Sequence, residues 1–284
     1  MPFWKRTRKP APSPPDLSEP DLRAVVLSDV GCVRDTNEDA ARFVRPTDSV
    51  LRSSRGCLAV LADGMGGHAA GEVASNLAVE TVAKVYYEQA EAGSEALRHA
   101  VQEANRVVYQ RAETQKGQRG MGTTCTAMVI LGNQFWLAQV GDSRAYRLHD
   151  GQATQLTIDH THVRELIDQQ LITLEEARQH PDRNVLTRAL GTRSQVVVDT
   201  DNEPHTLEFG ERLLLCSDGL YEYFTDAELA ELASTAYALS DAARQLVDTA
   251  KLRGGHDNLT VLLIERVAAT TIQSPRPTES FDLP

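Results

Sequence analysis

The sequence contains few cysteines and no long apolar run, and these shortages narrow the classes of protein it can encode. Its four cysteines form no CxxC pair, and three of them, Cys216 among them, fall inside apolar runs. This pattern indicates buried free thiols in a reducing compartment. No stretch approaches the roughly 20 apolar residues of a membrane-spanning helix, and residues 1–20 lack the apolar core of a signal peptide. We therefore expect a cytoplasmic protein without a membrane partner.

Positive charge is also scarce. The chain has 29 Lys and Arg against 40 Asp and Glu, which gives a formal net charge of -11. Such a chain repels nucleic acid, so we expect no nucleic-acid partner, while the excess of acids suits a cation site. A length of 284 residues with 41% hydrophobic content is enough for one large core. We expect a single catalytic domain that acts as a monomer.

Proline marks the ends of this domain. Residues 1–20 contain Pro2, Pro10, Pro12, Pro14, Pro15 and Pro20, which favour neither helix nor sheet. We predict a disordered arm there, whose basic cluster Lys5 to Lys9 is best interpreted as a solvated tail. Thr, Ser and Pro again dominate residues 268–284, which we predict to be a second disordered tail. The predicted domain spans residues 21–267.

Between the tails, short apolar runs alternate with helical periodicity. Helix patterns at residues 69–89 and 95–113 follow one another without a strand between them, and two more cover 226–232 and 241–252, with Ser240 as the expected N-cap. This order favours layers of helix pairs and antiparallel sheet over repeating βαβ units. The predicted strands are 24–27, 58–62, 125–131, 135–140, 145–148, 196–198, 212–216 and 259–264.

Residues 159–190 interrupt the strand pattern. They show weak helical periodicity, and Thr173 with Glu176 has the spacing of a capping box. Insertions of this kind on a β scaffold often act as lids. His160 and His162 lie in this segment, and we interpret them as packing or surface residues rather than as metal ligands.

Acidic residues recur at the ends of the predicted strands. Asp63, Asp142 and Asp218 each follow a strand, Asp257 precedes the last one, and Asp39 comes soon after the first. Clustered carboxylates with few histidines favour hard ions such as Mg²⁺ or Mn²⁺. Because Asp and Gly are also ordinary turn residues, a metal site and a purely structural role stay equally open on this argument.

The glycines after Asp63 raise a different possibility. Gly64, Gly66 and Ala69 fit the G-x-G-x-x-A pattern of a dinucleotide-binding turn. Two features disfavour it: Asp63 would place negative charge beside the pyrophosphate, and the following helix leads into a second helix instead of a parallel strand. The chain also contains no G-x-x-x-x-G-K-[ST] phosphate loop. The glycines instead allow a backbone carbonyl such as that of Gly64 to approach a metal closely.

Taken in order, these motifs resemble those of a known family. From about residue 23 to 266 their order and spacing are similar to the metal-dependent protein phosphatase family (PPM, protein phosphatase 2C), in its bacterial serine/threonine phosphatase form. One such motif alone is a weak signal, whereas the ordered set is specific. The motifs are Gly31 to Asp39, Ala62 to His68, Gly122 to Thr124, Val140 to Arg144, Ser217 to Leu220 and Asp257 to Thr260.

The resemblance implies an α+β fold, a four-layer αββα sandwich of two antiparallel β-sheets flanked by helix pairs, with residues 159–190 as a helical flap near the metal site. By the same resemblance Asp63 bridges two Mn²⁺ or Mg²⁺ ions and the Gly64 carbonyl binds one of them. Asp218 and Asp257 bind the other ion. Asp142, together with Asp218, matches a third and weaker site.

The resemblance also implies the remaining roles. Arg34 matches the arginine that grips the substrate phosphate, and Glu38 and Asp39 match residues that hold metal-bound waters. Water activated by the two central ions would attack the phosphoryl group. Animal relatives carry a histidine where Met65 stands, and methionine cannot supply a proton. A metal-bound water or His68 is then the candidate donor for the leaving group.

The implied activity is hydrolysis of phosphoserine and phosphothreonine on proteins, with a bacterial serine/threonine kinase as the expected counterpart. Two alternatives stay open at this point. The chain could be a pseudophosphatase that binds phosphoproteins without turnover, which an intact set of ligand positions disfavours. It could also act in an anti-sigma-factor pathway.

Overall fold

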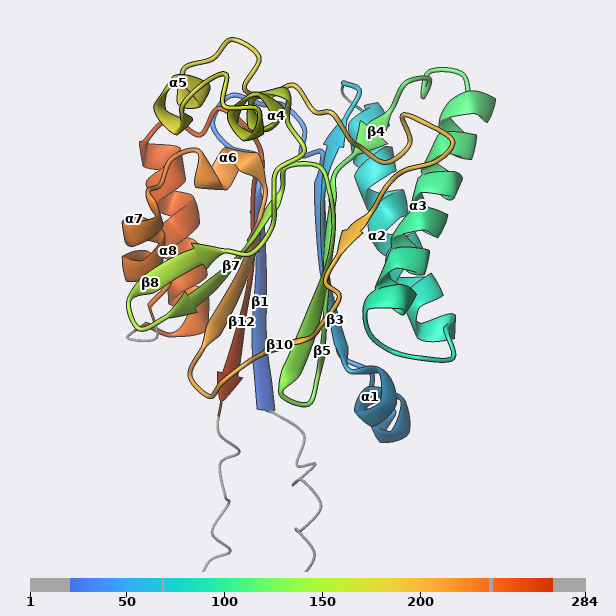
Figure 1. The fold of residues 1–284 in the computed structure, drawn as a ribbon, viewed down its shortest axis with the longest axis vertical. Coiled ribbons are helices and arrows are strands. Elements are labelled where there is room, and N and C mark those ends of the chain that lie inside the picture. Colours follow the sequence, from blue (N-terminus) through green and yellow to red (C-terminus); the bar gives the residue numbers. More distant parts are fainter. Residues whose placement is uncertain (1–20, 68, 235–236, 268–284) are drawn as a thin grey trace, which may run out of the picture.

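The computed structural model describes residues 21–67, 69–234 and 237–267. The predicted tails, residues 1–20 and 268–284, and the candidate donor His68 lie outside the described residues. Two antiparallel sheets lie face to face, with helices on both outer sides (Figure 1). The expected αββα sandwich is therefore confirmed.

One sheet has the strand order β1-β12-β11-β7-β8. The first and last strands of the described chain pair along their whole length, from Asp21 opposite Val267 to Asp29 opposite Leu259. The strands are β1 (Asp21–Asp29), β7 (Arg144–His149), β8 (Gln152–Gln155), β11 (Arg212–Cys216) and β12 (Leu259–Val267).

The other sheet has the order β10-β6-β5-β3-β2, with β4 attached to β3 and β9 attached to β6. Its central strands are almost fully buried, as their apolar sequences require. The strands are β2 (Asp39–Val44), β3 (Cys57–Met65), β4 (Gly122–Thr123), β5 (Cys125–Leu131), β6 (Gln134–Val140), β9 (Asp199–Thr200) and β10 (His205–Thr206).

Alternation along the strands builds three apolar layers. In β3, Leu58 and Val60 face one layer, whereas Ala59 and Leu61 face another. In β11, Leu214 faces a third layer and Leu213 shares the middle one with Ala59 and Leu61. Because successive side chains of a strand point to opposite faces, a continuous apolar run is buried on both sides. The middle layer joins the two sheets.

Helices cover the outer faces of both sheets (Figure 1). On one side, α2 packs through Ala70, Ala74 and Ala78, whose small side chains at a spacing of four let the helix approach the sheet closely. On the other side, α8 packs through Leu246 and Val247. The helices are α1 (Ser49–Arg55), α2 (Ala69–Glu88), α3 (Ser94–Thr114), α4 (His162–Asp168), α5 (Leu174–Arg178), α6 (Asp218–Tyr221), α7 (Asp226–Leu232) and α8 (Leu239–Leu252).

The segment 159–190 contains α4 and α5 and lies at one end of the sandwich (Figure 1). The predicted capping box is present, because Thr173 and Glu176 exchange side-chain and backbone hydrogen bonds. The segment returns to the sheet through a bridge between Leu190 and Thr123. Its base is thus tied to the β3–β4 region.

Two local predictions were wrong. Residues 196–198 form no strand, and the short pairing with β6 begins one residue later, at Asp199. Val196 and Val198 pack against the core from a loop, whereas Val197 is exposed. Ser240 is not the N-cap of the last helix, since α8 begins at Leu239 with Ala238 at the cap position. Leu239 is buried, so packing sets this boundary.

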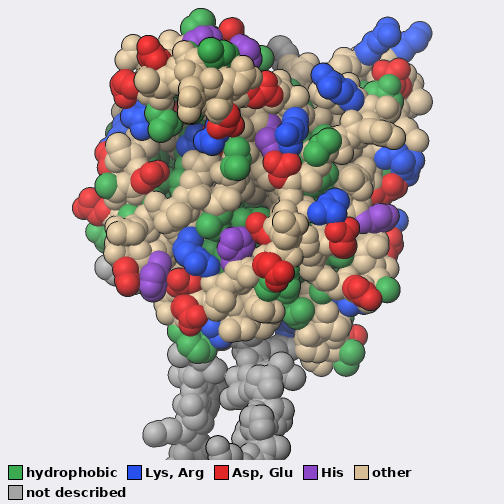
Figure 2. All heavy atoms as spheres, viewed as in Figure 1, with side chains coloured by type: hydrophobic (Ala, Val, Ile, Leu, Met, Phe, Trp, Pro, Cys, Tyr) green, Lys and Arg blue, Asp and Glu red, His purple; other side chains and the backbone are tan. Residues whose placement is uncertain are grey.

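The expectation of buried free thiols holds for three of the four cysteines. Cys57, Cys125 and Cys216 are buried and free, whereas Cys32 is exposed. Phe135 and Tyr146 are fully buried in the core. In the part of the chain that the structure describes, no helix combines the length and apolar character required to cross a membrane. Acidic and basic side chains are interspersed over the face shown in Figure 2.

Candidate functional site

Asp63 lies near the end of β3, two residues before the strand ends, rather than after it as predicted. Its backbone is fixed on both sides: its N–H donates to Thr124 Oγ1 at 2.9 Å, and its carbonyl accepts from Thr124 N–H at 2.9 Å. It stands opposite Asp39 of β2 in the antiparallel register. Strand pairing therefore places these two acids side by side, although 24 positions separate them in the numbering.

Asp39 is buried, and only one of its carboxylate oxygens has a hydrogen-bond partner. Ser217 donates to Oδ2 at 2.7 Å, whereas Oδ1 is buried without a partner. Ser217 belongs to the other sheet's end, directly after β11. An unpartnered buried carboxylate oxygen is costly unless a cation or water completes it.

Asp218 and Asp257 come from the facing sheet. Asp218 is the first residue of the short helix α6, directly after β11, and Asp257 comes just before β12. Because β11 and β12 are antiparallel neighbours, the last residues of β11 and the first residues of β12 lie at the same end of the sheet. Burial, followed by the charges of Asp39 and Asp218, raises the pKa of Asp63, so the two sheets bring their acids close together.

Asp142 is buried in the turn after β6. Its neighbour Ser143 shares a hydrogen bond of 2.6 Å with Thr124, the residue that holds Asp63. Arg144 forms a bidentate pair with Asp159, through Nε to Oδ1 and Nη2 to Oδ2, and its guanidinium lies 3.6 Å over the ring of Tyr221. Ser143 and Arg144 thus shape the loop that presents Asp142.

The five carboxylates are electrostatically linked. Burial, followed by the charges of Asp39, Asp218, Asp142 and Asp257, raises the pKa of Asp63 well above its ordinary value. Burial and then Asp218 do the same for Asp142, and burial and then Asp257 raise the pKa of Asp218. Burial raises the pKa of Asp39 to about 7. Without cations the cluster holds negative charge only at a considerable free-energy cost.

The donor chemistry fits divalent hard cations. Within the described residues, no three acid, histidine or cysteine side chains already surround a common point as a complete ligand set. The acids nevertheless converge, Asp39 Oδ1 lacks a partner, and mutual repulsion raises their pKa values. All the donors are oxygens, which Mg²⁺ and Mn²⁺ accept together with waters.

Arg34 lies at the open edge of this cluster. Its Nη2 donates to Asp257 Oδ2 at 2.6 Å, and half of its side chain is exposed. Burial opposes its charge, but Asp257 outweighs this and raises the pKa of Arg34, with smaller contributions from Glu38 and Asp63. A permanently charged guanidinium therefore faces both the acids and solvent.

Glycines pack the backbone around Glu38 and Gly64. A Cβ on Gly64 would meet the carbonyl oxygen of Gly71 at 2.2 Å, and one on Gly71 would meet Glu38 Oε2 at 1.9 Å. The Gly64 N–H donates to the Glu38 carbonyl at 3.1 Å. The close packing around Gly64 is thus possible only because Gly64 and Gly71 have no side chain.

Asn258 is a residue whose role sequence reasoning missed. Its side-chain amide donates to the carbonyls of Val30 and Thr36, and its Oδ1 accepts from the Glu38 N–H at 2.8 Å. One side chain thereby fixes the loop that carries Arg34 and Glu38. The motif Asp257 to Thr260 contained it, but only the fold shows what it touches. Thr124 and Ser217, which hold Asp63 and Asp39, were missed for the same reason.

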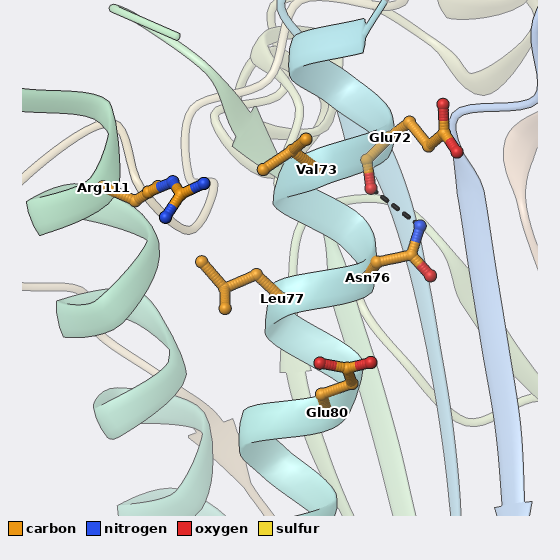
Figure 3. A pocket seen from close by; sticks show the side chains of 6 residues that line it. All are labelled: Glu72, Val73, Asn76, Leu77, Glu80 and Arg111. Carbon is orange, nitrogen blue, oxygen red and sulfur yellow. Dashed lines mark hydrogen bonds between the residues drawn. The ribbon is translucent and has the colours of Figure 1, made fainter. Parts of the chain in front are cut away.

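A groove on the outer helices is separate from this cluster. It has a volume of about 370 Å³ and is lined by Glu72, Val73, Asn76, Leu77, Glu80 and Arg111. Figure 3 shows Val73, Leu77 and Arg111 between α2 and α3. It shares no residue with the acidic cluster, and its mixed charges and apolar contacts suggest no chemistry of their own.

Comparisons with known proteins show which family the chain belongs to. The family model of protein phosphatase 2C matches residues 35–262. The serine/threonine phosphatase stp of Listeria monocytogenes is 38% identical over 250 residues, which cover 86% of this chain and 96% of that protein.

Solved structures give the same result. The structure of serine/threonine phosphatase Stp1 from Staphylococcus aureus is 34% identical with a TM-score of 0.79, over 88% of this chain and 97% of that one. The catalytic domain of the phosphatase PstP in complex with two manganese ions is 36% identical with a TM-score of 0.72, over 87% and 99% of the two chains.

The fold and the acidic edge define a metal-dependent phosphatase class, and the chain belongs to the protein phosphatase 2C family. The expected enzyme class, a protein serine/threonine phosphatase, is confirmed.

Proposed function

We propose that this chain hydrolyses phosphoserine and phosphothreonine on proteins at the acidic edge of the sandwich. The observation that carries the proposal is the convergence of Asp63 and Asp39 from one sheet with Asp218 and Asp257 from the other. Arg34 beside them supplies the positive charge that a phosphate requires.

Asp63, the Gly64 carbonyl, Asp218 and Asp257 would hold two Mn²⁺ or Mg²⁺ ions, and Asp142 with Asp218 a third. Such ions supply Lewis-acid chemistry, because they lower the pKa of water and neutralise phosphate charge. Glu38 and Asp39 would orient waters through their buried carboxylates. Ser217 and Thr124 keep the acids in place, since each donates to or accepts from one of them.

Arg34 would bind two phosphate oxygens through its planar guanidinium. In the structure it pairs with Asp257, and its half-exposed position lets it turn toward a substrate. Met65 cannot donate a proton to the leaving alkoxide. We propose that water held near Asp142 does so, with His68 as the alternative donor.

The experiment compares Mn²⁺-dependent hydrolysis of a phosphothreonine peptide and of para-nitrophenyl phosphate. EDTA should abolish both activities. Arg34→Lys should raise the KM of the peptide more than tenfold, because a lysine cannot make the bidentate contact. Arg193→Lys, an exposed arginine outside the cluster, is the matched control. Full activity in EDTA, or an unchanged KM in Arg34→Lys, would refute the assignment.

The biological setting extends the same proposal. We propose a cytoplasmic monomer that reverses the work of a serine/threonine kinase, since the enzyme class requires phosphorylated protein substrates. A comparison of phosphoproteins in cells with active enzyme and with Asp63→Asn would identify those substrates. An unchanged phosphoproteome would contradict a role in protein dephosphorylation.

A further inference from the structure

His160 makes contacts that the proposed chemistry does not use. It is buried in the flap segment, with 5% of its surface exposed. The ring Nδ1 accepts from the Gly141 N–H at 3.1 Å, and the backbone N–H of His160 donates to the Gly141 carbonyl at 2.9 Å. Gly141 is the residue directly before Asp142. The flap is therefore hydrogen-bonded to the turn that presents Asp142.

The other ring nitrogen is also engaged. Nε2 lies 3.0 Å from Asp199 Oδ2, and Arg188 donates to Asp199 Oδ1 at 2.7 Å. Because Nδ1 accepts, the proton must be on Nε2, which donates to Asp199. Asp199 therefore accepts from two donors, His160 Nε2 and Arg188 Nη1, which lie 3.3 Å apart. This arrangement fixes one tautomer of His160.

Neighbouring groups favour the neutral ring. Burial lowers the pKa of His160, and the cation of Arg188 adds to this effect, while Asp199 opposes it. Burial opposes ionisation of Asp199, but the hydrogen bonds from His160 and Arg188 hold its pKa below the ordinary value. With both nitrogens occupied, His160 has no free proton to give to a leaving group.

Backbone geometry explains why the turn needs this support. Gly141 has φ of +104°, and a Cβ there would meet Thr124 Cβ at 2.6 Å. The turn is thus held by Gln139 and Thr124 on the sheet side, and by His160 on the flap side. Among the residues that the structure describes, His160 alone connects the flap to the Gly141 amide next to Asp142.

We infer that His160 is a positioning residue, which couples the flap to the metal site by holding the Gly141 amide through Nδ1. Asp199 and Arg188 fix the tautomer that makes this contact possible. Residues that orient metal ligands in this way typically contribute 10–100-fold to metal affinity or activity. The inference rests on the proposed role of Asp142, but its first test does not.

The first test uses the unaltered protein without metal. Nitrogen-15 NMR of the imidazole at neutral pH should show a proton on Nε2 and none on Nδ1. The Gly141 amide should exchange slowly with deuterium. A ring protonated on Nδ1 would overturn the inference whatever the activity of the enzyme.

The second test uses two substitutions, each of which keeps only one of the two contacts that the ring nitrogens of His160 make. His160→Asn places its Oδ1 where Nδ1 lies and keeps the acceptor for Gly141, whereas His160→Gln reaches toward Asp199 and loses that acceptor. In the Gln variant the Gly141 amide should exchange at least tenfold faster, and kcat should fall at least tenfold with little change in KM. The Asn variant should retain both properties.

Equal loss in the two variants, or unchanged exchange of Gly141 in His160→Gln, would overturn the inference. Asp142→Ala separates this outcome from the proposed function. If that variant keeps full turnover, the assigned role of Asp142 fails, while the exchange of Gly141 still decides what His160 does.

Discussion

At the residue scale, the buried acids that are suited to bind cations lower the stability of the metal-free protein. Asp63, Asp142 and Asp218 are each pushed toward the neutral form by burial and by one another. A folded-state pKa above the unfolded value means that the folded protein binds more protons. Ionisation of these carboxyls therefore destabilises the metal-free protein as the pH rises above about 4.

Removing one charge should reveal this cost. We expect Asp63→Asn to melt at a higher temperature than the unaltered protein at pH 7 in EDTA, because it relieves repulsion. With saturating Mn²⁺ the order should reverse, since a proposed bridging ligand is lost. Circular dichroism during heating measures both melting temperatures.

The control is Asp182→Asn, which makes the same charge change at an exposed position outside the acidic cluster. It should alter neither melting temperature appreciably. A lower melting temperature of Asp63→Asn in EDTA as well would mean that the Asp63 carboxylate stabilises the fold by itself.

At the element scale, local signals predicted some boundaries and packing decided others. The Thr173–Glu176 capping box was readable because its bonds join residues three apart. Strand β2 was missed, because Asp39–Val44 mixes polar and apolar residues and gains its structure by pairing with β3. The short strand β9 was misplaced for a similar reason: two residues pair only because β6 is already there.

Helix α7 provides a test of local electrostatics. Glu228 caps it, receiving a hydrogen bond from the Thr225 N–H at 2.9 Å and one from Arg253 at 2.6 Å. The Arg253 contact, followed by the Thr225 amide, lowers the pKa of Glu228 to about 2. Because the folded value is below the unfolded one, this contribution is present above about pH 4.5 and disappears as the pH falls toward 2.

We expect Glu228→Gln to melt at a lower temperature than the unaltered protein by nearly the same gap at pH 7 and pH 5, and the gap to shrink at pH 3.5. Glu231→Gln, an exposed acid on the same helix, should show no such trend. Thermal denaturation at the three pH values provides the measurement. If the difference in melting temperature did not change with pH, the charge of Glu228 would not contribute to the stability of the helix cap.

At the scale of the whole molecule, the site lies where the two sheets meet. Asp39 and Asp63 come from one sheet, and Asp218 and Asp257 from the ends of β11 and β12 in the other. The middle apolar layer holds these sheets in one orientation. Cations bound at the shared edge would therefore stabilise the domain as a unit.

Mn²⁺ should raise the melting temperature more at pH 7 than at pH 5. Protons compete for the same carboxyls, whose folded-state pKa values are raised, so metal binding must release more protons at the lower pH. Differential scanning calorimetry should show one transition that shifts as a whole and returns on addition of EDTA. Two transitions, only one of them sensitive to Mn²⁺, would show that the sheets unfold separately.

The sequence by itself predicted layers of helix pairs and antiparallel sheet, because apolar periodicity is a local property of the chain. Its ordered motifs indicated the αββα fold, the enzyme class and the candidate acids through a resemblance to a known family. The sequence alone did not show which of the strand ends that carry acids, such as that of Asp63, lie close together. Tertiary structure decided which acids meet, which oxygen of Asp39 lacks a partner and which side chains support them. Register between strands and packing between sheets set those contacts, and both depend on residues distant in the chain.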